Sequence, residues 1–185
     1  MLALDPNVAL GRQDLMTYLD LCNIASRNVV LDPAGTAIGV GSTAKVLLTN
    51  TIGYTVGAVS GAALGGIFKS KTTAEVAFTA TTMNIPANAA SIQEACYYMC
   101  VNAAGTLSIV MGAIATGAGN AQWPERSAVA DGLAIWGGVR IAVAAAAPGS
   151  THDFVAGTTA LSDGRLSAVT YYDFGYIAPA FSAAM

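Results

Sequence analysis

Short strand-like runs separated by turn residues fill most of this chain, and they constrain its fold more than any other feature. Large or β-branched side chains concentrate in these runs, and glycine, asparagine and aspartate stand between them. No segment with helical periodicity separates one run from the next, so parallel strands with helical crossovers are disfavoured. The pattern predicts a mainly β, antiparallel sandwich or barrel of the jelly-roll kind. The predicted strands cover residues 45–49, 53–59, 75–80, 95–102, 106–111, 133–143 and 166–172.

The turn residues predict how some of these strands connect. Gly105 favours a hairpin between 95–102 and 106–111, with the glycine at positive φ. Asn50–Ile52 predicts a tight turn between 45–49 and 53–59, and Asp163-Gly164 a second hairpin. Gly137-Gly138, inside a strand, predicts a bulge or a close backbone approach.

The first 28 residues follow a different pattern. Leu15, Met16, Leu19 and Cys22 recur at helical spacing, and no glycine or proline interrupts 12–27. We expect an extended arm, then one amphipathic helix, then a loop over 29–41. The chain therefore divides into an N-terminal arm, helix and linker (1–41) and a β domain with a C-terminal tail (42–185). The apolar stripe of the helix is the predicted assembly interface; packing on its own sheet is the alternative.

Charged residues are scarce. They make up 10% of the chain, against roughly 25% in ordinary soluble proteins. One interpretation is that other subunits bury much of the surface; the other is a monomer with a neutral Ser/Thr/Asn surface. With eight basic residues, a net charge of −3 and no basic stripe, we expect neither nucleic-acid nor membrane binding. No apolar run is long enough to span a membrane, and we expect no signal peptide.

The residues that usually carry chemistry are few and scattered. The chain has three cysteines, Cys22, Cys96 and Cys100, and an odd number predicts reduced thiols in the core. Cys96 and Cys100 would lie on one strand, too far apart for a disulfide. One histidine, His152, cannot complete a zinc site with them, and it reads as part of a polar loop rather than a catalytic base. We therefore expect no enzyme activity, metal or cofactor.

Five stretches resemble virion structural proteins of tailed bacteriophages. They are KVLLTNTIGY at 45–54, NIPANAAS at 84–91, ATGAGNAQWP at 115–124, VRIAV at 139–143 and VTYYD at 169–173. The likeness covers roughly 42–173 and carries no catalytic motif.

Within that class, the size and the β body are most similar to capsid decoration (cement) proteins. The resemblance implies a subunit made in the host cytoplasm and carried in the virion, where it binds and stabilises the phage head. Its partners would be itself, as a homotrimer, and the major capsid protein or other virion subunits. The alternative is a head-fibre or tail-associated module that binds the host or its glycans through exposed tyrosines or Trp123.

Overall fold

A computed structural model describes residues 28–39, 44–57, 67–125, 128–129, 132–149 and 151–174. This part of the chain is mainly β and every strand pair is antiparallel, as predicted. The predicted N-terminal helix and most of the C-terminal tail lie outside these residues. The strands are β1 (Val29–Val30), β2 (Thr36–Ile38), β3 (Lys45–Leu48), β4 (Ile52–Val56), β5 (Ile67–Lys71), β6 (Ala74–Ala77), β7 (Gln93–Asn102), β8 (Leu107–Met111), β9 (Ala115–Thr116), β10 (Leu133–Val143) and β11 (Leu166–Asp173).

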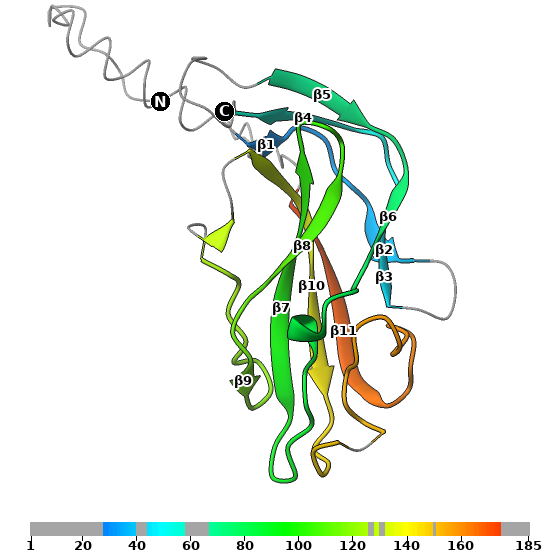
Figure 1. Ribbon diagram of the computed structural model, residues 1–185, viewed down its shortest axis with the longest axis vertical. Coiled ribbons are helices and arrows are strands. Elements are labelled where there is room, and N and C mark those ends of the chain that lie inside the picture. Colours follow the sequence, from blue (N-terminus) through cyan, green and yellow to red (C-terminus); the bar gives the residue numbers. More distant parts are fainter. Residues whose placement is uncertain are drawn as a thin grey trace, which may run out of the picture.

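The longest strands form a five-stranded sheet in the order β11-β10-β7-β8, with β9 also paired to β7 (Figure 1). The β7–β8 hairpin turns at Gly105, whose φ is +77°, as the sequence predicts. Between β7 and β10 the register shifts from Ile135 to Gly137, which is the predicted bulge. The sheet is open among the described strands, so the arrangement is sandwich-like and not a closed barrel.

The second layer consists of three extended segments, 29–38, 45–56 and 67–77, each bent near its middle. Each segment contributes one half to each of two three-stranded sheets, β1-β4-β5 and β2-β3-β6. The predicted turn at Asn50–Ile52 is therefore wrong, because β3 and β4 continue one segment into different sheets and do not pair. The predicted loop over 29–41 is also wrong where β1 and β2 form. Both strands pair with strands beyond residue 42; the proposed domain boundary itself falls in 40–43, outside the described residues.

Two carboxylates complete the hydrogen bonding at the bend. Asp32 accepts the N–H of Gly53 at 2.7 Å. Asp173, the last residue of β11, accepts the N–H groups of Ala34 and Gly35 at 2.8 and 2.7 Å. Backbone N–H groups that leave a ladder need another acceptor, and a carboxylate is a strong one. Asp173 thereby joins the bent layer to the five-stranded sheet.

The core lies between the layers and is centred on three rings. Phe78 contacts Tyr97 and Phe154 edge-on, with ring centroids 5.0 and 5.3 Å apart. All three side chains are fully buried, and the Tyr97 hydroxyl donates to the carbonyl oxygen of Met83 at 2.8 Å. Edge-to-face packing of this kind adds to the free energy gained by burying the rings.

The predicted second hairpin at Asp163-Gly164 does not form. A turn is present there, but β11 pairs with β10, and the segment before the turn forms no strand. Phe154 instead makes an isolated bridge with Ile85. The Phe154 ring is buried in the core, and residues 155–165 form no strand that could pair with β11.

We predict that Asp173→Ala lowers the free energy of unfolding by about 3 kcal/mol, because the N–H groups of Ala34 and Gly35 lose a charged acceptor. Urea denaturation measures it. Glu75→Ala is the control: its carboxylate pairs with Lys45 at 3.3 Å on the surface, and its loss should cost at most about 1 kcal/mol. Equal effects of the two substitutions would contradict the role of Asp173.

Two tyrosines with buried hydroxyl groups should respond in opposite ways to loss of the hydroxyl. The Tyr171 hydroxyl is buried without a hydrogen-bond partner among the described residues, and burial raises the pKa of Tyr171 to about 12. Tyr171→Phe should leave stability unchanged or raise it, whereas Tyr97→Phe breaks the bond to Met83 and should cost about 1 kcal/mol. Thermal unfolding of both variants is the measurement, and a Tyr171→Phe variant less stable than Tyr97→Phe would refute the assignment.

Candidate functional site

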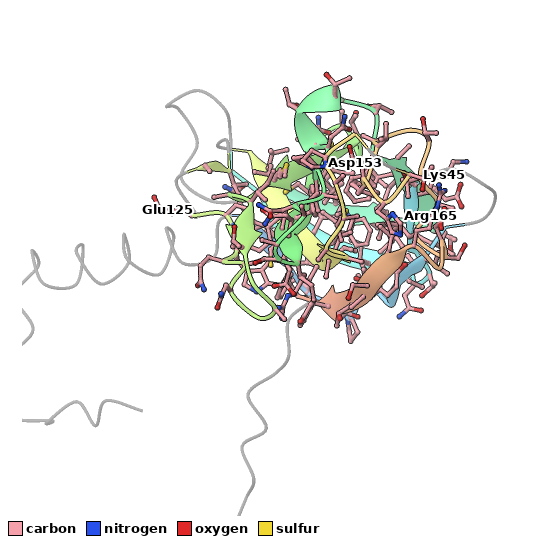
Figure 2. All side chains as sticks on the ribbon, turned by 90° about the horizontal axis from the view of Figure 1, so that it is seen from below. Lys45, Glu125, Asp153 and Arg165 are labelled. Atoms are coloured by element: carbon pink, nitrogen blue, oxygen red, sulfur yellow. The ribbon has the colours of Figure 1, made fainter. Side chains whose placement is uncertain are left out.

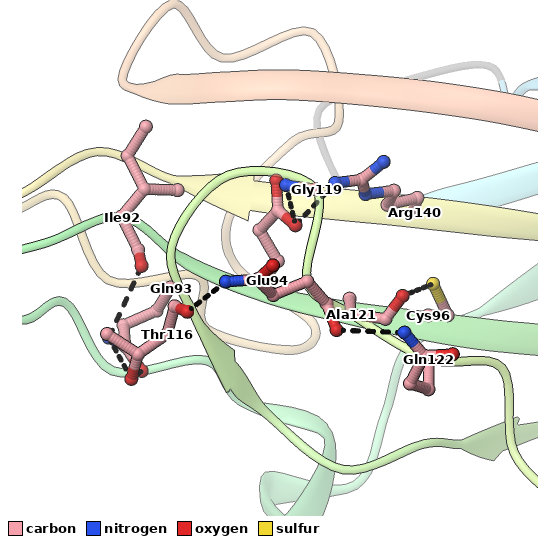
Figure 3. A network of polar contacts seen from close by, with 10 residues as sticks. Ile92, Gln93, Glu94, Cys96, Thr116, Gly119, Ala121, Gln122 and Arg140 are labelled. Carbon is pink, nitrogen blue, oxygen red and sulfur yellow. Dashed lines mark hydrogen bonds and ion pairs between the residues drawn. The ribbon is translucent and has the colours of Figure 1, made fainter.

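The outer face of the five-stranded sheet, turned away from the core, collects most of the polar and aromatic side chains that are not needed for packing. A loop over 112–125, which includes β9, folds across part of this face (Figure 3). The short strand β9 in this loop pairs with the start of β7. The face is formed by alternate residues of three strands: Glu94, Cys96 and Tyr98 of β7, Gly138, Arg140 and Ala142 of β10, and Ala168, Thr170 and Tyr172 of β11.

An ion pair anchors the loop to the face. Arg140 Nη2 lies 2.5 Å from Glu94 Oε2, and the N–H of Gly119 donates to the same oxygen at 2.9 Å (Figure 3). Only 5% of the Glu94 side chain is exposed, against 26% of Arg140. The hydrogen bond that Arg140 donates to Glu94 is the main reason that the pKa of Arg140 is raised. A buried carboxylate held by a cation and a backbone donor is satisfied, so the loop is fixed in place.

The two cysteines of β7 are buried thiols, as predicted. Cys96 donates weakly to the carbonyl oxygen of Ala121 in the covering loop, at 3.8 Å. Burial is the main cause that raises the pKa of the Cys96 thiol, which disfavours the reactive thiolate. These thiols are therefore packing groups.

Four rings gather over Gly138, and we refer to them as the aromatic cluster: Tyr98, Trp123, Tyr172 and Phe174. Tyr98 and Trp123 are stacked, with centroids 5.3 Å apart and an interplanar angle of 10°. Phe174 meets Trp123 edge-on at 5.0 Å and has 37% of its surface exposed. A Cβ at Gly138 would come within 2.6 Å of Trp123 and Phe174 atoms, so the close approach predicted for Gly137-Gly138 is confirmed.

A recess of about 380 Å³ lies beside the ion pair. Its polar groups come from Glu94, Arg140 and Thr170, and small residues (Gly119, Ala142 and Ala168) leave the space open. The volume is near the lower limit of ordinary ligand sites. The arrangement offers hydrogen-bond donors and acceptors.

The residues singled out in the sequence lie elsewhere. Leu15, Met16, Leu19 and Cys22, the predicted assembly interface, fall outside the described residues. His152 is half-exposed in a turn region, away from the recess lining. Among the described residues, no three His, Cys, Asp or Glu side chains are grouped as metal ligands, and no helix is long and apolar enough to cross a membrane.

Comparisons with family models, with characterised proteins and with solved structures find no match to this chain. The resemblance to phage virion proteins therefore stays a prediction.

We predict that Gly138→Ala disturbs the aromatic cluster, because the added methyl group overlaps two rings. The expected cost is about 1–3 kcal/mol, with a change in the near-ultraviolet circular dichroism of the stacked Tyr98–Trp123 pair. Gly164→Ala is the matched control: it meets no atom within 4 Å, and it should be neutral or stabilise by about 0.5 kcal/mol. An unchanged spectrum for Gly138→Ala would contradict the packing described here.

Proposed function

We propose that this protein is a non-enzymatic structural subunit of a virus particle, most specifically a decoration protein that binds and stabilises a phage head. The observation that carries the proposal is how few charges remain on the surface of a β sandwich. The proposal rests on that observation together with the sequence resemblance.

Internal hydrogen bonds use many of the few charged groups. Asp32 and Asp173 bind backbone N–H groups at the bend, and Asp153 binds that of Ala87 at 2.9 Å. Glu94 and Arg140 neutralise one another. Figure 2 shows Glu125 on the side opposite to Lys45 and Arg165. These two cations are paired with Glu75 and Asp163. Such a surface brings little repulsion when identical subunits crowd on a shell.

The free side of β11 supports self-association. This strand lies at the end of its sheet, and no described strand pairs with its other side. Ser167, Ala168 and Thr170 are exposed, and the strand contains no lysine, arginine or proline. Natural proteins usually protect long edges with such residues, because an unprotected edge can pair with another chain. We therefore propose that the chain forms a homo-oligomer, specifically a homotrimer, in which this edge contacts a neighbouring subunit.

A head-fibre or tail-associated module is the second candidate. The exposed ring of Phe174 in the aromatic cluster favours it, since exposed aromatic rings are common in binding sites. The two roles differ in abundance: a decoration protein covers the head in many copies, and a fibre module is sparse.

Quantitative mass spectrometry of purified phage particles whose genome carries this sequence tests the proposal. We expect the chain in a ratio to the major capsid protein that an icosahedral shell allows. A sparse ratio would support the fibre role instead, and absence from particles would refute both.

Deleting residues 1–27 tests the assembly role of the N-terminal segment. The deletion stops before Asn28, whose Oδ1 accepts the N–H of Gly57 at 2.9 Å and belongs to the folded body. We expect the truncated chain to keep its β circular dichroism and to lose binding to undecorated heads in co-sedimentation. An unfolded product would place the segment in the core, and normal binding would show that it is dispensable.

A further inference from the structure

We propose that the recess beside Arg140 is a binding site for a neutral carbohydrate. The site goes beyond the virion role and does not depend on it.

The charge balance of the recess points to an uncharged ligand. Its one cation and one anion are already paired at 2.5 Å, so the site as a whole carries no net charge. An anionic ligand would have to compete with Glu94 for Arg140, and a cationic one would have to compete with Arg140 for Glu94. Either exchange leaves a buried charge without its partner, which is costly.

The polar groups suit hydroxyl groups, which donate and accept. Arg140 presents several N–H donors on a side chain that is 26% exposed, and only Nη2 is used by Glu94. Thr170, exposed on β11 and paired in register with Arg140, adds a hydroxyl that both donates and accepts. A few converging polar groups of both kinds orient a ligand in a small site.

The apolar groups suit the flat C–H face of a sugar ring. Ala142 and Ala168 line the recess without filling it. A pyranose seated over the alanines would lay its C–H groups on them and turn its hydroxyls toward Arg140 and Thr170. Neutral sugars combine these two surfaces in one molecule.

Saturation-transfer NMR on the full chain tests the site with maltotriose, cellotriose and chitotriose as neutral probes and sialyllactose as the charged comparison. We expect at least one neutral probe to bind with a Kd of about 1 mM or tighter. Ala168→Trp fills the recess and should weaken that binding at least about tenfold. Ser162→Trp, an equally bulky change at an exposed turn outside the recess, should bind as the wild type does.

A second variant keeps the test decisive if Ala168→Trp does not fold. Thr170→Val preserves shape and removes the hydroxyl, and it should weaken binding by about fivefold, the effect of one hydrogen bond. Failure of all three neutral probes, preference for sialyllactose, or unchanged affinity in a folded recess variant would each overturn the proposal. Because these outcomes do not depend on particle binding, they are distinct from failure of the virion role.

Discussion

The fold depends on the carboxylates that complete the bend of the second layer. Three extended segments must bend to follow the five-stranded sheet, and a bent ladder leaves N–H groups without strand partners. Asp32 accepts a hydrogen bond from the N–H of Gly53, and Asp173 accepts those from Ala34 and Gly35. Without these bonds the bend would bury unsatisfied donors, and the two halves of the layer would not cover the core around Tyr97. Two carboxylates thus hold the bend, and one of them, Asp173, joins it to the five-stranded sheet.

The long strands could be predicted because their signals are local. Large and β-branched side chains along 95–102 and 133–143 and the glycine at 105 are sufficient to give β7, β10 and the β7–β8 hairpin. The bend could not be predicted, because asparagine and glycine mark a bend and a hairpin turn alike. What distinguishes them is a partner far along the chain: Asp173 and Ala34 are 139 positions apart. No local pattern contains that contact.

The candidate site was predictable to a similar extent. Gly137-Gly138 predicts a close backbone approach, and Gly138 lies directly beneath Trp123 and Phe174. The convergence of Tyr98, Trp123 and Tyr172 was not visible, because it requires the register of three strands and the path of the covering loop. The same holds for Glu94 and Arg140, which β7 and β10 bring within hydrogen-bonding distance although they are 46 positions apart.

β11 contributes to three separate features, and sheet geometry keeps them compatible. Its last residue holds the bend, its free edge can pair with another chain, and its outer face carries Thr170 and Tyr172. Strand pairing uses backbone groups in the plane of the sheet, whereas side chains project perpendicular to that plane. A copy that pairs along the β11 edge would therefore extend the sheet without covering the recess. The proposed self-association and the proposed carbohydrate site would make separate demands on the same eight-residue strand, so each could be removed without the other.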